Sequence, residues 1–183
     1  MKSEISLGIL DLAENSLRAG ASLIEISIDV SSFEGSLNVS VRDNGCGMTA
    51  EQLEKAVDPF FTTKETEGSG LGLPFLKDSA ECTGGTFQIE SVKGKGTCVK
   101  AVFGLFHINR MPLGDIGATV RAVMVLCSDV VFSFSADGKG FVMDTRAIRK
   151  ILGGVSLDSA PIMEYIKEYL EENIQEASGE IKL

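Results

Sequence analysis

Three polar side chains stand out on an otherwise apolar stretch near the N-terminus. Asp11, Asn15 and Arg18 lie at positions i, i+4 and i+7. On a helix, this spacing places a carboxylate, an amide and a guanidinium in a row along one face. Such a row is unusual on a helix whose other residues are mostly apolar, so we expect these side chains to serve a site.

A second segment with chemical potential follows a predicted strand. Asp43 ends the strand, and Gly45 and Gly47 come directly after it. Glycines at these positions allow the backbone to approach a flat ligand closely. Further along the chain, the tight turn 94–97 (Gly-Lys-Gly-Thr) leads into the last strand of the N-terminal half.

A glycine-rich stretch separates two predicted helices. The segment 58–64 (Asp-Pro-Phe-Phe-Thr-Thr-Lys) runs into 68–72 (Gly-Ser-Gly-Leu-Gly), directly before a helix. The free backbone N–H groups at a helix N-terminus form a site for anionic phosphate. A Gly-x-Gly sequence alone is more often a simple turn, so the argument depends on all four segments together.

In this order and spacing, the four segments closely resemble the superfamily of gyrase, heat-shock chaperone ATPases, histidine kinases and mismatch-repair ATPases. Its nucleotide site is called the Bergerat fold, and the resemblance runs from about Asp11 to Phe106. The resemblance implies that the chain binds ATP together with Mg²⁺.

The resemblance also implies a role for each of the leading residues. Asp43 is similar to the carboxylate that accepts the exocyclic amine of adenine, and Thr97 would help through a water molecule. An acceptor at this place selects adenine over guanine, because it would be left unpaired opposite the guanine carbonyl. Asn15 is similar to the asparagine whose oxygen holds Mg²⁺ against the phosphates. Arg18 stands where histidine kinases carry a Lys or Arg on a phosphate.

Further nucleotide contacts are implied in the loops. Gly68, Gly70 and Gly72 would hold the phosphates through main-chain amides, and residues 62–68 would form a lid over ATP. The remaining residues implied to contact the nucleotide are Gly45, Gly47, Met48, Thr62, Lys64 and Leu71.

Asp11 is the candidate general base. In the hydrolysing branch of the superfamily, and in the anti-sigma-factor serine kinases, a glutamate four residues before the metal-binding Asn acts as the general base. Aspartate can transfer the same proton, but its side chain is about one methylene shorter. The neighbouring Glu14 should point elsewhere on the helix, so we expect it to be structural.

The regular elements predicted around these segments define the fold class. Residues 5–21 have the apolar spacing of a helix, and 24–30 and 37–41 alternate like a hairpin with one buried face. A capping box at Thr49 predicts a short helix to about residue 57, followed by a helix over 73–82 and strands over 87–92 and 97–106. The pattern predicts a two-layer α/β (α+β) sandwich with a mixed, mostly antiparallel sheet and helices on one face.

A second, smaller unit is expected after residue 110. Helices near 116–127, 146–152 and 161–174 flank strands near 130–135 and 141–144. We therefore expect a histidine kinase-like ATP-binding domain over 1–110 and a small C-terminal appendage over 111–183.

Composition narrows the class of protein. The 183 residues are 44% hydrophobic and 23% charged, as in ordinary globular proteins, and the net charge of −9 with scattered basic residues argues against a nucleic-acid partner. No apolar run is long enough for a spanning helix, and the N-terminus does not look like a signal peptide. Four widely spaced cysteines predict reduced thiols. We expect a cytoplasmic protein with no membrane partner.

The branch of the superfamily stays open at the sequence level. Residues 14–21 resemble the corresponding segment of mismatch-repair ATPases, whereas residues 59–64 and 70–74 resemble those of sensor histidine kinases. Only ten residues precede Asp11, so we expect no phosphoacceptor hairpin in this chain, and we expect the single His107 on the surface or in packing. The leading hypothesis is a stand-alone protein kinase that phosphorylates a partner protein. The alternatives are an ATP-binding or ATP-hydrolysing switch that controls dimerisation or partner binding, and a regulatory module that only holds ATP.

Overall fold

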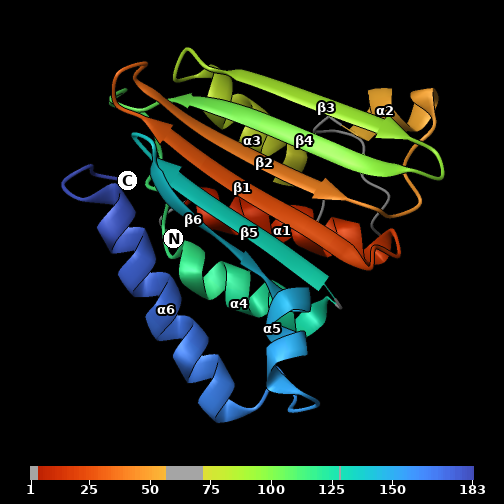
Figure 1. Cartoon of the computed structure of the whole chain (residues 1–183). Coiled ribbons are helices and arrows are strands. Elements are labelled where there is room, and N and C mark those ends of the chain that lie inside the picture. Colours follow the sequence, from red (N-terminus) through yellow and green to blue (C-terminus); the bar gives the residue numbers. More distant parts are fainter. Residues whose placement is uncertain (1–3, 57–71, 128) are drawn as a thin grey trace.

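The computed structural model describes residues 4–56, 72–127 and 129–183 (Figure 1). Within these ranges, six strands form one mixed sheet in the order β3-β4-β2-β1-β5-β6. The strands are β1 (Leu23–Ser31), β2 (Ser36–Asp43), β3 (Thr86–Val92), β4 (Gly96–Gly104), β5 (Asp129–Ala136) and β6 (Lys139–Asp144). Neighbouring strands are antiparallel except for β1 and β5, which are parallel. The predicted fold class is confirmed.

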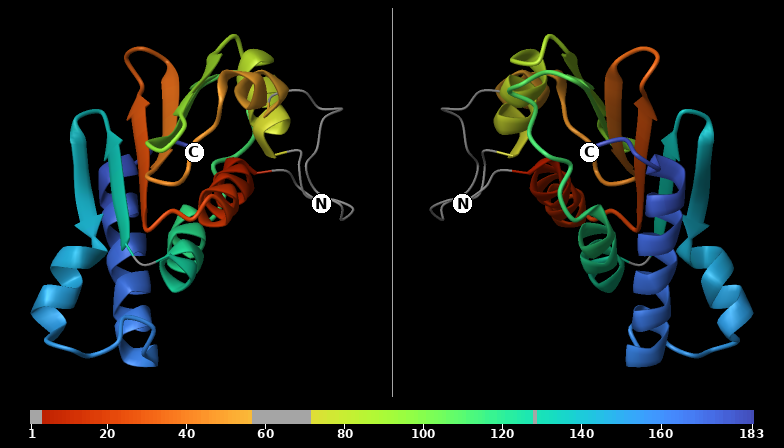
Figure 2. Two further views of the ribbon diagram at one scale, coloured as in Figure 1. Left: turned by 90° about the vertical axis from the view of Figure 1, so that its right-hand side faces the viewer. Right: turned by 90° about the vertical axis from the view of Figure 1, so that its left-hand side faces the viewer.

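Helices pack on one face of this sheet. The helices of the described residues are α1 (Ile5–Arg18), α2 (Ala50–Ala56), α3 (Gly72–Glu81), α4 (Ile116–Leu126), α5 (Thr145–Leu152) and α6 (Ala160–Ser178), of which α5 lies beyond the end of β6 (Figure 2). Figure 2 shows α1, α3 and α4 on the same side of the strands. Among the described residues, no helix combines the length and the apolar character needed to cross a lipid bilayer.

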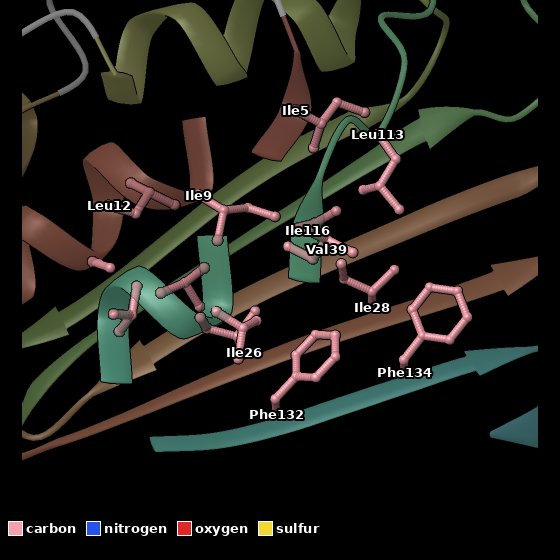
Figure 3. Packing of buried hydrophobic residues seen from close by; sticks show 14 of the residues in the cluster. Ile5, Ile9, Leu12, Ile26, Ile28, Val39, Leu113, Ile116, Phe132 and Phe134 are labelled. Carbon is pink, nitrogen blue, oxygen red and sulfur yellow. The ribbon is translucent and has the colours of Figure 1, made fainter. Parts of the chain in front are cut away.

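The core explains why the strands alternate. In β1, Ile24, Ile26 and Ile28 are buried, while the residues between them are more exposed on the other face. Period-two alternation of this kind buries one face of a strand and leaves the other to solvent. Figure 3 shows Ile26 and Ile28 beside Phe132 and Phe134 of β5, below residues of α1 and α4.

The C-terminal range shares this sheet and this core. β5 continues the sheet beyond β1, with Ile26 paired to Phe132 and Ile28 to Phe134. The elements expected after residue 110 are present, and β5 and β6 extend the sheet of the N-terminal range. The physical reason is that β5 buries the same face as β1, so the apolar surfaces of the two strands join.

Local signals set the helix that borders the site. The capping box predicted at Thr49 is present: the Gln52 N–H donates to Thr49 Oγ1 at 3.3 Å, and the Thr49 N–H donates to Gln52 Oε1 at 3.0 Å. This reciprocal pair satisfies two backbone donors at the start of α2. α1 ends at Arg18, three residues before the predicted end, and Gly20 follows with a φ of 75°.

Candidate nucleotide-binding site

A cavity of about 650 Å³ lies between α1, α2 and the ends of β2 and β4. This volume falls within the usual range for small-molecule sites. Asn15 from α1, Asp43 from β2 and Thr97 from β4 all line it, together with Gly47 and Met48 from the connection after β2. The structure therefore brings together predicted residues from three separate segments.

Asp43 is held in place by three donors. Its Oδ2 accepts a hydrogen bond from Ser16 Oγ at 2.7 Å. Its Oδ1 accepts from the N–H of Gly45 at 2.8 Å and from the N–H of Thr97 at 3.3 Å. Hydrogen bonds to a carboxylate are among the strong ones in proteins, so this side chain is oriented before any ligand arrives.

The glycines beside Asp43 are required by close packing. Gly45 is buried, and a Cβ there would crowd Ala19 and the Asp43 carboxylate. Gly47 has a φ of 61°, and a Cβ there would overlap the carbonyl oxygen of Val92. The chain after β2 is thereby pressed against the β3–β4 turn, which places the backbone of Gly47 and Met48 at the wall of the cavity.

Two members of the predicted polar row, Asn15 and Arg18, are neighbours on α1. Asn15 lines the cavity, and its Oδ1 accepts a hydrogen bond from Arg18 Nη2 at 2.7 Å. Arg18 is exposed and stands one turn further along the helix. The amide oxygen and the guanidinium are thus neighbours at the mouth of the site, where a cation and a phosphate could bind.

Asp11 lies outside the described lining of the cavity. It is exposed on α1, one turn before Asn15, and it lies close to Gly72 at the start of α3. A Cβ on Gly72 would crowd the Asp11 side chain, so α1 and α3 meet here without room for a larger residue. The predicted residues Thr62, Lys64, Gly68, Gly70 and Leu71, and the predicted lid, lie outside the residues that the structure describes.

Three side chains contribute to the site without having been predicted. Ser16 holds Asp43 from α1, and Ser91 on β3 bonds to Thr97 and to the Met48 N–H. Asn44 Oδ1 accepts from the N–H groups of Ser22 and Leu23, which ties the chain after β2 to the start of β1. Serine and asparagine are common at many positions of a chain, so the role of these three residues becomes apparent only from the hydrogen-bond partners that the fold brings to them.

A second hollow, of about 600 Å³, lies at the other end of β4 around Phe106, His107 and Arg110. The Arg110 guanidinium already donates to the carbonyl oxygens of Leu105, Met111 and Lys182. Because its donors are used within the chain, this hollow offers a ligand less polar recognition than the cavity at Asp43. His107, the single histidine of the sequence, lines this second hollow and follows the end of β4 opposite to Thr97.

The residues at the first cavity fit ATP and a magnesium ion. The carboxylate oxygens of Asp43 accept hydrogen bonds, which suits the amine of adenine, and Asn15 supplies the kind of oxygen ligand that Mg²⁺ takes. Lys55, which pairs with Glu51 on α2, adds a cation to the lining.

Comparison with known proteins finds matches to ATPases and histidine kinases. A family model described as histidine kinase-, DNA gyrase B-, and HSP90-like ATPase matches residues 3–107. The sensor histidine kinase ZraS of Escherichia coli O157:H7 is 41% identical over 88 residues, which cover 48% of this chain and 19% of ZraS. The sensor histidine kinase WalK of Bacillus subtilis is 36% identical over 81 residues, which cover 42% of this chain and 13% of WalK.

Among solved structures, the nucleotide-free catalytic domain of the histidine kinase ThkA is 29% identical with a TM-score of 0.40, covering 51% of this chain and 61% of that one. This chain spans less than a fifth of the length of ZraS and of WalK. Since the family model matches more than half of the 183 residues, the chain belongs to the histidine kinase-, DNA gyrase B- and HSP90-like ATPase family.

Proposed function

We propose that this chain binds ATP with Mg²⁺ in the cavity beside α1 and transfers the terminal phosphoryl group to a partner protein. The observation that carries the proposal is that the acceptor oxygens of Asp43 and the side-chain amide of Asn15 line the same cavity. Matches to sensor histidine kinases support a phosphoryl-transfer role.

Each residue has a part in this proposal. Asp43 binds the exocyclic amine of adenine, with Thr97 beside it. Asn15 would hold a magnesium ion through its side-chain oxygen, and such an ion would supply charge neutralisation at the phosphates. Arg18 leaves Asn15 and moves to a phosphate, a change that requires only a side-chain rotation because the guanidinium is exposed.

Asp11 is the proposed base of the transfer. It lies one helical turn from Asn15 on α1, so it faces the side on which the terminal phosphate would lie. There it would accept the proton of a partner's Ser or Thr hydroxyl; a histidine side chain of the partner is the other acceptor that the kinase relatives suggest.

The proposed setting is the cytoplasm, which supplies ATP. All four cysteines are free thiols, as expected in a reducing compartment. The partner is a protein substrate or regulator, or a second copy of this chain.

The test is phosphoryl transfer from labelled ATP to proteins that co-purify with the chain. We expect labelling of a partner by the native protein and a loss of about 10²- to 10⁴-fold in Asp11→Asn, the usual worth of a general base. Glu14→Gln, a change of the same kind on the same helix, should retain the activity. Equal rates in Asp11→Asn and the native protein would contradict the role of Asp11.

A second candidate is an ATP-driven switch that controls dimerisation or partner binding. The observation that favours it is the sequence 14–21, which begins in α1 and resembles mismatch-repair ATPases. Light scattering with and without ATP separates the two: a nucleotide-dependent change in mass without transfer to any partner would favour the switch.

A further inference from the structure

Ser91 lies behind the cavity wall, on the edge strand β3, and is cross-strand neighbour to Thr97. Its hydroxyl takes part in three contacts. The Met48 N–H donates to Ser91 Oγ at 2.8 Å, the oxygens of Ser91 and Thr97 lie 2.8 Å apart, and Ser91 Oγ lies 3.1 Å from the carbonyl oxygen of Gly96.

One arrangement of protons satisfies all three contacts. A serine hydroxyl has a single proton to donate and two lone pairs to accept with. The Gly96 carbonyl can only accept, so the Ser91 proton goes there. The Met48 N–H and the Thr97 hydroxyl then both donate to Ser91 Oγ.

This arrangement determines what Thr97 offers to a ligand. Its hydroxyl proton is engaged with Ser91, so toward the cavity the oxygen can only accept a hydrogen bond. Asp43, whose oxygens accept from Ser16 and from the N–H groups of Gly45 and Thr97, likewise presents acceptors there. Two acceptors side by side suit a donor on the ligand, or a water that the ligand donates to.

We infer that Ser91 is a positioning residue that fixes the Thr97 hydroxyl as an acceptor and thereby favours a 6-aminopurine over a 6-oxopurine. This inference rests on the proposed function, because it assigns a specificity residue to the same nucleotide site. Without Ser91, the Thr97 hydroxyl could turn its proton toward the cavity and donate to a 6-oxo group.

The same contacts give Ser91 a second effect. By accepting from the Met48 N–H, it ties the connection after β2 to β3, next to Gly47, which packs against Val92. Loss of the Ser91 hydroxyl would therefore loosen this wall of the cavity and lower the affinity for all purine nucleotides by the same factor. Selectivity, and not affinity alone, separates the positioning role from this structural one.

The experiment measures dissociation constants of ATP and ITP by calorimetry for the native chain, Ser91→Ala and Ser91→Thr. ITP is the probe because it replaces the 6-amino group by a 6-oxo group and carries no 2-amino group. We expect the preference for ATP over ITP to fall about three- to tenfold in Ser91→Ala, the worth of one hydrogen bond. Ser91→Thr restores a hydroxyl on a strand that tolerates β-branched residues and should recover most of the preference.

Two controls sharpen the result. Ser27→Ala removes a hydroxyl from β1 that only accepts from Ser133 on the open face of the sheet, and it should leave the preference unchanged. On a Thr97→Ala background, Ser91→Ala should change the preference no further, because its effect passes through the Thr97 hydroxyl. If Ser91→Ala proves poorly folded, Thr97→Ala alone still tests the inference: it should lower the preference for ATP over ITP, and an unchanged preference would overturn the inference.

The outcomes distinguish the inference from the proposed function. If the native chain binds ATP selectively and Ser91→Ala lowers both affinities by the same factor, the inference is overturned and the ATP site stands. If the native chain binds neither nucleotide, the proposed function falls, and the inference with it.

Discussion

The carboxylate of Asp43 shows how a single residue can be prepared for a ligand. Three donors from α1, from the chain after β2 and from β4 converge on its two oxygens. Each of these bonds is worth more than a neutral hydrogen bond, and together they leave one orientation for the carboxylate. The side chain meets a base without having to reorganise.

We predict that Asp43→Asn weakens ATP binding about 10- to 150-fold, the equivalent of one lost hydrogen bond to a charged group. The amide would have to turn one of its own donors toward the Ser16, Gly45 and Thr97 donors or toward the amine of adenine. Calorimetric titration measures the affinity, and circular dichroism should show an unchanged fold. Asp78→Asn, the same change on the exposed side of α3, is the matched control. An unchanged affinity in Asp43→Asn would show that the base binds elsewhere.

At the scale of elements, the site depends on short connections that cannot accept side chains. Gly47 and Gly96 both have positive φ, and a Cβ on either would overlap a backbone carbonyl of the facing segment. The chain after β2 and the β3–β4 turn therefore behave as one wall, joined further by the hydrogen bond from the Gly94 N–H to the Cys46 carbonyl at 2.7 Å.

We predict that Gly47→Ala lowers the free energy of unfolding by more than about 2 kcal/mol, since backbone strain and an overlap with Val92 add together. Gly84→Ala is the matched control: Gly84 has a φ of 75° but no neighbour within 4 Å of an added Cβ. It should cost only about 1 kcal/mol, the strain of the left-handed backbone alone. Urea unfolding measures both, and equal losses would show that the close packing at Gly47 does not contribute.

The start of α5 adds a pH-dependent contribution to stability. Asp144 caps the helix by accepting from the Arg146 N–H at 2.9 Å, and its hydrogen bonds with the Arg146 side chain hold the pKa of Asp144 below the usual aspartate value. A lowered pKa in the folded state means that the contribution is present above the unfolded pKa and is lost as pH falls through the folded pKa.

We predict that Asp144→Ala lowers the free energy of unfolding by about 1 kcal/mol at pH 7, the typical worth of a helix cap. The difference from the native protein should shrink when unfolding is measured at a pH below the lowered pKa of Asp144, because the carboxylate of the native protein is then protonated. Asp144→Asn keeps a capping oxygen and should lose less than the alanine variant at pH 7. A difference that is the same at both pH values would rule out the carboxylate charge as its cause.

At the scale of the whole molecule, β5 decides how the chain is divided. It pairs in parallel with β1 along eight residues, from Leu23 with Asp129 to Val30 with Ala136. Its buried aromatic residues Phe132 and Phe134 lie in the same core as Ile9 and Leu12 of α1 (Figure 3). The helix that carries Asn15 therefore packs on a core to which the C-terminal range contributes.

We predict that residues 1–110 alone do not form a stable monomer. Removing 111–183 would expose the edge of β1 and the apolar residues that β5 and α4 cover, and an exposed apolar edge strand promotes aggregation. Size-exclusion chromatography and proton NMR of the fragment measure this. A monomeric, well-dispersed fragment that binds ATP would instead support the division into two domains at residue 110.

The order and type of the elements followed from the sequence by itself, and so did the prediction that Asn15, Asp43 and Thr97, which line one cavity, serve a common site. Helical spacing, strict alternation in β1 and the capping box at Thr49 are local signals, and each depends on residues only a few positions apart. Asp11, Asn15, Asp43 and the glycine-rich stretch were recognisable because a resemblance ties their spacing to a known kind of site.

The tertiary structure alone decided the pairing of β5 with β1 and the roles of Ser16, Ser91 and Asn44. The pairing of β1 with β5 joins residues about a hundred positions apart. The alternation of buried and exposed residues in β5 predicts a strand with one buried face, but it does not determine which strand lies beside it. A serine hydroxyl gains its role only from the atom it meets across the fold: for Ser16 the Asp43 carboxylate, for Ser91 the Thr97 hydroxyl. No local sequence pattern predicts these contacts, because they form only when segments far apart in the chain pack together.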